Sequence, residues 1–377
     1  MDALVTDVHF RSAVAGVRGL GRAGLEVIAL GPGRAAAGRW SRYASRRGVA
    51  PEVADDPVGF MREAGRLAER YGPLVMYPCR EETIDALLGT ADRHPPEVLV
   101  PYPGVDSMKA LRDKARLPEQ AARASLRTPE MYFEGFVGEV DPDAIPLPCL
   151  VKQDHKRNTL AHPRTVQSRE ELEEVVAGLP QWERLIAQEH VAGDLMALSV
   201  VIDKEGRIAA RFQQRAKRTW PPGAGPSTVA VSVPVDEELV EKVRTMLADA
   251  GYWGLAQLQF IAAPEPALID VNLRFYGSLA LALASGVNLP AIWHDVTLDR
   301  ARSEPPEYQV GVTYRWLENE FVAAIHGRPK ILLSRLPKPK TGAMWAPDDP
   351  VPGVLLAAGA LLRWLARRVP RRRRHSR

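Results

Sequence analysis

Four polar residues at alternate positions in two short apolar segments have the types and spacing to hold a metal ion: Gln257, Gln259, Asp270 and Asn272. The link between the segments is short, which predicts a β-hairpin. Because side chains alternate between the two faces of a strand, we expect all four on one face. Carboxylate and amide oxygens suit Mg²⁺, which keeps some water and shares other positions with substrate phosphates. An amphipathic hairpin with a solvated polar face fits the same pattern.

The register of this hairpin follows if Ala262 pairs with Ala267. Gln259 then lies opposite Asp270, and the remaining polar pair follows in the same register. The opposite face is expected to bury four apolar side chains, namely Leu258, Phe260, Ile269 and Val271.

The elements that must support the hairpin fall into two regions. In the first, strands are expected at 3–8, 25–30, 74–77 and 98–101, and helices at 12–23, 57–71 and 81–88. Strands that alternate with helices predict a parallel sheet with both faces covered. From about Val105 the strands become longer and more polar, and their connections become rich in proline, which predicts a new domain.

The segment 19–24 contains a Gly-x-Gly-x-x-Gly pattern, which in dinucleotide-binding proteins joins a strand to a helix. Here the glycines come at the end of the expected helix, so Gly24 is better explained as a helix terminator. An NAD-dependent dehydrogenase is therefore a weak third alternative.

Composition and charge exclude several classes of function. The 377 residues are 46% hydrophobic and 25% charged, which is typical of a globular protein. Much of the net charge of +4 comes from arginines near the C-terminus, and no basic stripe with interleaved aromatics indicates a nucleic-acid partner. Cys79 and Cys149 form no Cys-x-x-Cys pair and no N-terminal segment has the order of a signal peptide, so we expect a cytoplasmic protein.

One long stretch carries a family resemblance. Residues 270–278, Asp-Val-Asn-Leu-Arg-Phe-Tyr-Gly-Ser, and then 284–290, Ala-Ser-Gly-Val-Asn-Leu-Pro, resemble the ATP-grasp superfamily. The similarity looks greatest to predicted carboxylate–amine ligases whose first domain is related to that of carbamoyl phosphate synthase. It implies a Rossmann-like (pre-ATP-grasp) α/β domain at 1–104 and an α+β ATP-grasp domain at 105–318. The latter would have a small lobe at about 125–192 and a large lobe at about 193–318, followed by a C-terminal extension at 319–377.

The resemblance also implies a reaction. ATP would activate a small-molecule carboxylate as an acyl phosphate, and an amine would then attack it, giving an amide, ADP and phosphate. The implied cofactors are ATP and Mg²⁺, with Mn²⁺ as an alternative metal. The identities of the two substrates stay open, and so does the formation of a homo-oligomer.

Site residues follow from the same resemblance. Gln259, Asp270 and Asn272 would hold the metal, and Arg274 would stabilise the transferring phosphoryl group. Lys114 and Lys152 correspond to the two lysines that bind phosphates. The inter-lobe hinge that binds adenine and ribose corresponds to Gln188, Glu189, His190, Val191 and Asp194. Arg215 and Lys217 belong to a basic segment near the phosphates, and residues 154–163 are a candidate cover for them.

Two departures from the family pattern raise an alternative. The family usually has glutamate at the positions of Gln259 and Asp270, so the metal site here has one charge fewer and a shorter carboxylate. Mg²⁺ demands tight octahedral geometry. The second hypothesis is therefore a catalytically degenerate ATP-binding module with a regulatory or scaffold role.

The C-terminus has its own pattern. Residues 354–369 are apolar apart from a few arginines, and a run of four arginines follows at 371–374. The stretch is too short and too charged to span a bilayer. It predicts either a packed terminal helix with a basic end or a helix that lies on an anionic membrane surface, which would place the protein at the inner face of the membrane.

Overall fold

The structure is a computed structural model. The structure describes residues 1–90, 94–113, 116–153, 163–221, 225–300, 304–325 and 339–368.

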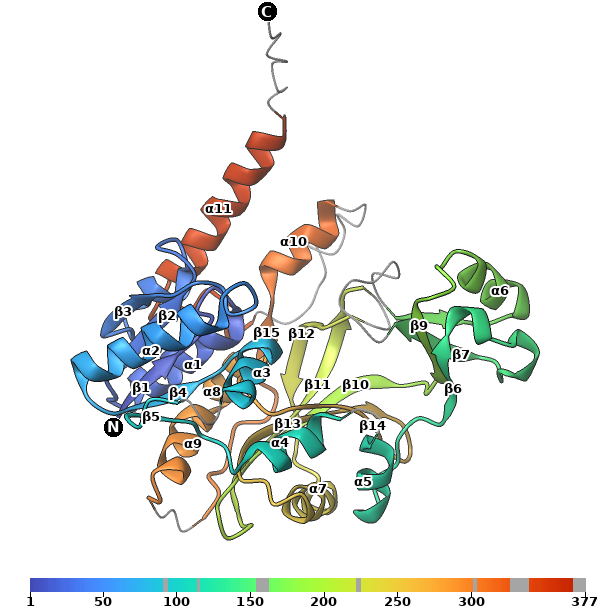
Figure 1. Ribbon diagram of the computed structural model, residues 1–377, viewed down its shortest axis with the longest axis horizontal. Coiled ribbons are helices and arrows are strands. Elements are labelled where there is room, and N and C mark those ends of the chain that lie inside the picture. The colour runs from blue at the N-terminus through green and yellow to red at the C-terminus, as the bar shows by residue number, and fades with distance from the viewer. Residues whose placement is uncertain are drawn as a thin grey trace, which may run out of the picture.

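The N-terminal region is a five-stranded parallel sheet in the order β3-β2-β1-β4-β5 (Figure 1). Its strands are β1 (Asp2–Val5), β2 (Val27–Gly31), β3 (Arg46–Val49), β4 (Leu74–Tyr77) and β5 (Val98–Leu99), and its helices are α1 (Arg11–Arg22), α2 (Pro57–Tyr71) and α3 (Glu81–Gly89). Alternate residues of β1 enter different cores: Ala3 and Val5 pack with α1, and Leu4 packs with α2. The predicted Rossmann-like domain with two covered faces is confirmed.

The largest sheet has the order β14-β13-β10-β11-β12-β15-β16. Its strands are β10 (Asp194–Ile202), β11 (Ile208–Thr219), β12 (Ser227–Ser232), β13 (Gly254–Ala262), β14 (Ala267–Asn272), β15 (Thr313–Arg315) and β16 (Thr341–Gly342). The helices around it are α4 (Val105–Arg112), α7 (Glu237–Asp249), α8 (Leu279–Ser285), α9 (Leu289–Thr297) and α10 (Leu317–Ile325). Helix α7 packs against β10, and α9 packs against β10, β11 and β13. In the view of Figure 1 both helices lie below this sheet.

A separate four-stranded antiparallel sheet has the order β6-β9-β7-β8. It contains β6 (Met131–Phe136), β7 (Cys149–Gln153), β8 (Arg164–Val166) and β9 (Arg184–Glu189), and α6 (Arg169–Ala177) packs against β8. Helix α5 (Leu117–Arg123), which precedes β6 in the chain, packs against α7. Short 3-10 helices lie at Ala37–Trp40 (η1), Val137–Glu139 (η3) and Pro142–Ala144 (η4). This sheet has a core of its own that includes Cys149. Both cysteines are buried free thiols. Together with the two larger sheets it gives the predicted arrangement of an α/β domain followed by a two-lobed α+β domain.

The glycines of the Gly-x-Gly-x-x-Gly pattern have a packing role. Gly19 lies inside α1, where a methyl group would come within 2.7 Å of Pro290, and Gly21 lies equally close to Tyr43. Gly24 follows the helix with φ 84°, which favours glycine. The interpretation of this segment as a helix end is confirmed, and its small residues allow α1 to approach the neighbouring elements closely.

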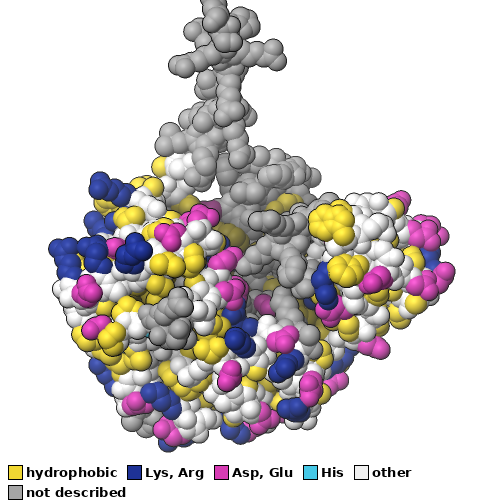
Figure 2. All heavy atoms as spheres, viewed as in Figure 1, with side chains coloured by type: hydrophobic (Ala, Val, Ile, Leu, Met, Phe, Trp, Pro, Cys, Tyr) yellow, Lys and Arg dark blue, Asp and Glu magenta, His cyan; other side chains and the backbone are white. Residues whose placement is uncertain are grey.

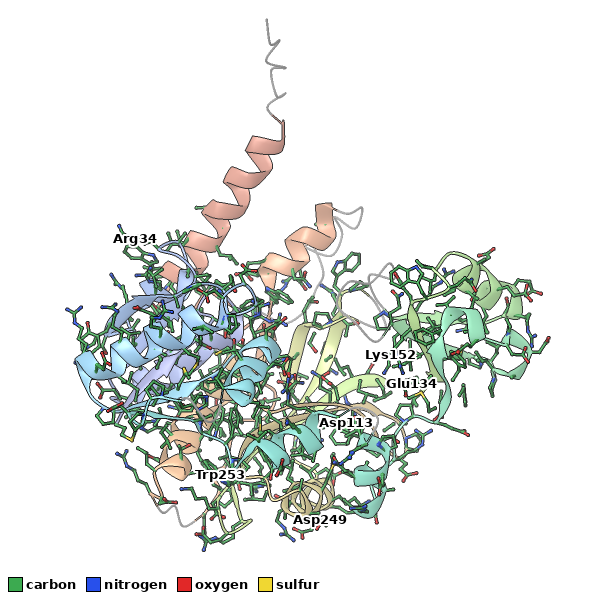
Figure 3. The ribbon with its side chains drawn as sticks, viewed as in Figure 1. Arg34, Asp113, Glu134, Lys152, Asp249 and Trp253 are labelled. Carbon is green, nitrogen blue, oxygen red and sulfur yellow. The ribbon has the colours of Figure 1, made fainter. Side chains whose placement is uncertain are left out.

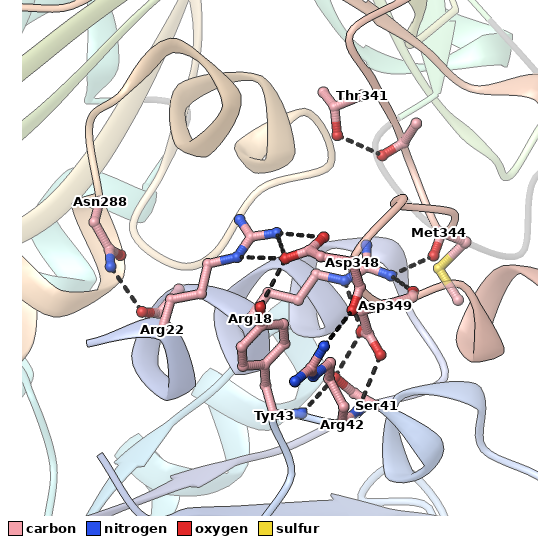
Figure 4. Close-up of polar contacts among 12 residues, drawn as sticks. Arg18, Arg22, Ser41, Arg42, Tyr43, Asn288, Thr341, Met344, Asp348 and Asp349 are labelled. Atoms are coloured by element: carbon pink, nitrogen blue, oxygen red, sulfur yellow. Dashed lines mark hydrogen bonds and ion pairs between the residues drawn. The ribbon is translucent and has the colours of Figure 1, made fainter. Parts of the chain in front are cut away.

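The chain returns to the N-terminal domain near its end. Arg18 and Asp349 form an ion pair in which the side chains are only 2% and 1% exposed. Arg18 donates from Nε to Asp349 Oδ2 at 2.9 Å and from Nη2 to the Met344 carbonyl at 2.6 Å (Figure 4). Ser41 Oγ donates to the same carboxylate at 2.7 Å. This buried cluster fixes the segment that leads into the last helix.

That last helix is α11 (Val351–Arg368). Its first turn lies against η1, and beyond this turn the ribbon projects away from the body of the protein (Figure 1). Val354 is 59% exposed and Leu355 is 38% exposed. Within the described residues, no helix is long and apolar enough to cross a membrane.

We predict that Asp349→Ala lowers the free energy of unfolding by about 3–5 kcal/mol, because it leaves the Arg18 charge buried without its partner. Urea unfolding followed by circular dichroism measures this loss. The matched control is Asp348→Ala, which removes the neighbouring carboxylate. Asp348 and its partner Arg22 are 40% and 32% exposed, so we expect a loss of about 1 kcal/mol or less. If the two variants lose the same free energy of unfolding, burial does not decide how much these ion pairs stabilise the fold.

Candidate functional site

A cleft of about 680 Å³ lies between the four-stranded sheet and the seven-stranded sheet. Strands β7 and β9 line it from one side, and β10, β11 and β13 line it from the other. Eight of the predicted site residues line it: Lys152, Gln188, Glu189, His190, Val191, Asp194, Lys217 and Gln259. On the face shown in Figure 2, acidic and basic side chains are interspersed over the described parts of the molecule.

The predicted hairpin forms the edge of the large sheet. Gln259 pairs with Asp270 and Gln257 pairs with Asn272, as the sequence predicts. Asn272 donates from Nδ2 to Asp270 Oδ2 at 3.0 Å, and the Gln257 and Gln259 amides lie 3.4 Å apart (Nε2 to Oε1). Asn272 Nδ2 also lies 3.5 Å from Gln257 Oε1, which joins the four polar side chains into one cluster. Leu258 and Phe260 are fully buried on the other face.

The predicted register is wrong by one residue at the closed end of the hairpin. Ala267 pairs with Ile261 and not with Ala262, because a β-bulge follows the Gln259–Asp270 pair. The bulge inserts Ile269, which lines the cleft, and Leu268 takes its expected place in the core. A bulge adds an unpaired residue to one strand, so it changes the face of the residues on one side of it only.

The polar row extends beyond the hairpin. Ala197 pairs with Gln259 on one side and with Gln214 on the other, so the three lie side by side across the sheet. Gln214 is 3% exposed and donates from Nε2 to Ser278 Oγ at 2.7 Å. Gln214 and Ser278 both line the cleft and were missed at the sequence level. Period-two alternation in the strand containing Gln214 was the signal that could have found it.

Lys152 approaches the cleft from β7, between the two sheets, as Figure 3 shows. On β9 it pairs with Ile186, three residues before Glu189. The resemblance implies Glu189 and Asp194 as the two candidates for binding ribose. Glu189 is already engaged: its carboxylate accepts hydrogen bonds from Arg127 Nη2 and, at 3.2 Å, from the Glu130 backbone. Asp194 is exposed at the start of β10, and within the described residues its side chain makes no hydrogen bond.

The three predicted catalytic cations have different surroundings. Lys217 lines the cleft, whereas Arg215 is exposed and does not appear among the cleft residues. Successive residues of a strand point to opposite faces, and Arg215 follows the cleft residue Gln214 directly. Arg218, one residue after Lys217, also lines the cleft and pairs with the fully buried Glu320 at 2.8 Å.

Arg274 connects the large sheet to the N-terminal domain. It donates from Nε to Glu81 Oε1 at 2.7 Å, and Glu81 also binds Arg112 at 3.0 Å. Burial acts to raise the pKa of Glu81, but the two arginines outweigh it and hold that pKa below its ordinary value. Glu81 therefore stays ionised and keeps Arg274 at the first turn of α3.

Two predictions fall on parts that the structure does not describe. Lys114 lies outside the described residues, and so do residues 154–162 of the candidate phosphate cover.

The donor set of the hairpin fits a hard cation. Asp270 supplies a carboxylate, and Gln257, Gln259 and Asn272 can supply amide oxygens, which suit Mg²⁺ or Mn²⁺ and not Zn²⁺. The described residues contain no cluster of three or more His, Cys, Asp and Glu side chains that could hold a metal. With one carboxylate, this site needs further negative charge from a ligand such as a phosphate.

Comparisons with known proteins give one family match. Residues 181–320 match a family described as "ATP-grasp in the biosynthetic pathway with Ter operon". A comparison with curated proteins finds no significant match.

Solved structures resemble most of the chain. N5-carboxyaminoimidazole synthetase from Staphylococcus aureus, complexed with ADP, has a TM-score of 0.64 at 13% identity, over 86% of each chain. L-amino acid ligase from Bacillus licheniformis has a TM-score of 0.57 at 17% identity, over 79% of this chain and 74% of that one. The biotin carboxylase domain of Hydrogenobacter thermophilus 2-oxoglutarate carboxylase, in complex with MgADP, ADP and bicarbonate, has a TM-score of 0.60 at 14% identity, over 83% and 73%. At these identities the likeness shows the fold.

We predict that Gln259→Glu tightens the binding of Mn²⁺ with ADP roughly tenfold, because it adds a second carboxylate beside Asp270. Isothermal titration calorimetry at fixed ADP and varied metal measures the change. The control is Gln259→Met, which removes the amide without adding charge and should weaken metal binding. If both variants bind the metal as the unchanged protein does, this face of the hairpin is not the metal site.

Proposed function

From the premise that this chain has the ATP-grasp fold, we propose that it is an ATP-dependent ligase that joins a carboxylate to an amine. The observation that carries the proposal is the polar cluster of the hairpin: its members Gln257 and Gln259 line one wall of the cleft, and Lys152 lines the other. Asp270 and Asn272 do not line the cleft themselves but pair with these two glutamines. One wall offers oxygen ligands for a divalent cation and the opposite wall offers a cation for phosphates. This is the arrangement that a nucleoside triphosphate with its metal ion requires.

The residues divide the binding of ATP among them. Asp270 and Asn272, with Gln259, hold the Mg²⁺ that neutralises the phosphates, and Lys152, with Lys114, binds phosphate oxygens. A lysine suits this task because its charge sits on a flexible stem that follows phosphate positions. Support for the metal role comes from the hydrogen bond between Asp270 and Asn272, which holds both side chains together.

Adenine and ribose belong at the hinge formed by Gln188, Glu189, His190 and Val191. Backbone groups there would read the edge of the base. Of the two ribose candidates we favour Asp194, because the Glu189 carboxylate is already bound to Arg127 and to the backbone of Glu130.

The reaction proceeds in two steps. The substrate carboxylate attacks the terminal phosphorus of ATP, so a C–O–P linkage forms, the bond to ADP breaks, and ADP leaves. The amine then attacks the carbonyl carbon of the acyl phosphate, an amide bond forms, phosphate leaves and the amine loses a proton. Lys217, which lines the cleft, supplies positive charge that stabilises the transferring phosphoryl group. Arg274 would add to this charge only on leaving Glu81, and Arg215 only from the other face of β11. Exclusion of water from the cleft would protect the acyl phosphate.

A second candidate function is an ATP-binding module without catalysis. It is favoured by one observation, the amide of Gln259 opposite the single carboxylate of the cluster. Such a protein would bind ATP through the same hinge and lysines but would release no ADP.

We predict that the protein releases ADP from MgATP in the presence of at least one acid–amine pair from a panel of amino acids and small carboxylic acids. Asp270→Asn and Lys152→Met should each lower kcat/KM by roughly 100-fold or more, because each removes a charge that faces the reacting phosphates. The measurement is a coupled assay for ADP together with mass spectrometry of the amide.

The matched control is Lys109→Met, which removes the same charge from an exposed position on α4 and should leave kcat/KM within about twofold. If the protein binds ATP but releases ADP with none of the acid–amine pairs, the result would contradict the ligase hypothesis and favour the ATP-binding module. A failure to bind ATP would contradict both.

We further propose that α11 lies on an anionic membrane surface, which places the protein at the inner face of the membrane. Support comes from the exposed apolar side chains of Val354 and Leu355 and from the projection of the helix away from the body (Figure 1). The sequence beyond the helix adds the arginine run 371–374, whose charge complements anionic headgroups.

We predict that the full chain sediments with vesicles of phosphatidylglycerol and phosphatidylcholine, and that deletion of 354–377 abolishes this. The deletion keeps Asp349 and its buried contacts, so the body should stay folded. Vesicles of phosphatidylcholine alone should bind more weakly, because the arginines then find no anionic partner. Equal sedimentation of the full and shortened chains would contradict a membrane role for α11.

A further inference from the structure

The cleft has a basic group that the proposed ATP site does not use. Arg11 lines the cleft, although it belongs to the N-terminal domain. It is the first residue of α1 and follows the loop after β1, so it lies at the carboxyl edge of the parallel sheet. Strand β1 is the point from which the sheet order runs to β2 on one side and to β4 on the other. In open parallel sheets, ligands bind at this kind of switch point.

The guanidinium of Arg11 is held firmly in place. Its Cζ atom lies 3.3 Å from the centroid of the Trp316 ring. Gly277 also lies against it, because a methyl group there would come within 2.4 Å of Nη2. Residue 277 can therefore be only glycine while Arg11 keeps this position. A side chain held against an aromatic ring and a glycine loses little further entropy when it binds a ligand.

The guanidinium is also incompletely satisfied. Its Nη1 atom is buried and has no hydrogen-bond partner among the described residues. A buried donor that lacks a partner costs free energy, and the cost is larger for a charged group. In the same cleft, the Gln214 Oε1 atom is also buried without a partner among the described residues. Gln214 is bound to Ser278, the residue after Gly277, which lies against Arg11. A cleft that holds an unsatisfied cation and an unsatisfied acceptor suits a ligand with an anionic oxygen and a hydrogen-bond donor.

Two side chains near Arg11 must be considered as its partners. Burial raises the pKa of the Tyr314 hydroxyl overall, although the charge of Arg11 and a hydrogen bond to it act to lower that pKa. That hydroxyl donates to the Gly277 carbonyl at 3.2 Å, and among the described residues no hydrogen bond joins it to Nη1. The second, Glu318 in the first turn of α10, is influenced by the charge of Arg11, but within the described residues its Oε2 atom and Arg11 Nη1 are both without a hydrogen-bond partner. Burial raises the pKa of Glu318. Glu318 therefore leaves Nη1 available.

We propose that Arg11 binds a carboxylate or phosphate group on one of the two molecules that the enzyme joins. That molecule therefore carries an anionic group in addition to the group that reacts. This inference rests on the proposed ligase function and extends it to a class of substrate. The nucleotide base belongs at the opposite end of the cleft, between β9 and β10, whereas Arg11, Gly277 and Ser278 form the end next to the N-terminal domain.

The test measures binding of malonate and of inorganic phosphate to the full chain saturated with MgADP, by calorimetry. We expect the unchanged protein to bind at least one of the two anions. Arg11→Met should weaken that binding by roughly 10- to 100-fold, the effect of losing a charged hydrogen-bond pair. Arg11→Lys should restore part of it, and Glu318→Gln should leave it intact. The affinity for MgADP should stay within about twofold in all three variants.

Each other outcome overturns the proposal. Binding of neither anion to the unchanged protein, or equal binding to Arg11→Met, would remove the anion site while MgADP binding kept the ATP site. Loss of MgADP affinity in Arg11→Met would assign the guanidinium to the nucleotide. If Arg11→Met does not fold, Gly277→Ala takes its place, because the added methyl group displaces the guanidinium from its position. Once turnover is found, a raised KM for the acid or for the amine in Arg11→Lys identifies which substrate carries the anionic group.

Discussion

The rest of the site depends on the pairing of β13 with β14. One face of this hairpin carries Leu258 and Phe260 into the core, so the opposite face, with its polar residues, must line the cleft. A slip of one residue would exchange the two faces. The register does shift by one residue, at the bulge that follows the Gln259–Asp270 pair. The shift affects only the closed end of the hairpin, so the polar cluster stays on one face.

The cleft also needs the N-terminal domain, which contributes Arg11 to it and holds Arg274 through Glu81. Close packing of α1, made possible by its glycines, fixes this domain against the large sheet. The buried pair of Arg18 and Asp349 ties the returning C-terminal segment to the same helix. The ATP-grasp fold thus supplies the walls of the cleft, and contacts between distant parts of the chain decide which charges face one another.

Local patterns were enough to predict much of this fold. Alternating strands and helices gave the parallel sheet, and period-two polarity gave the face shared by Gln259 and Asp270, because both signals depend on residues close together in the chain. The bulge at Ile269 could not be predicted, because Leu268 and Ile269 are both apolar and either one could point into the core at this position. Arg11 was not singled out, because its importance comes from Gly277 and Trp316, which lie 266 and 305 residues further along the sequence. The roles of Lys152 and of the hinge residues remain predictions.

The central claim is that a nucleotide lies between the two antiparallel sheets with its metal on the hairpin. A crystal structure with Mn²⁺ and a non-hydrolysable ATP analogue tests it most directly, because the anomalous signal of Mn²⁺ locates the ion independently of the nucleotide. We expect the anomalous peak at the Asp270 carboxylate, with the phosphates between it and Lys152. A nucleotide bound elsewhere, or a metal remote from Asp270, would contradict this account.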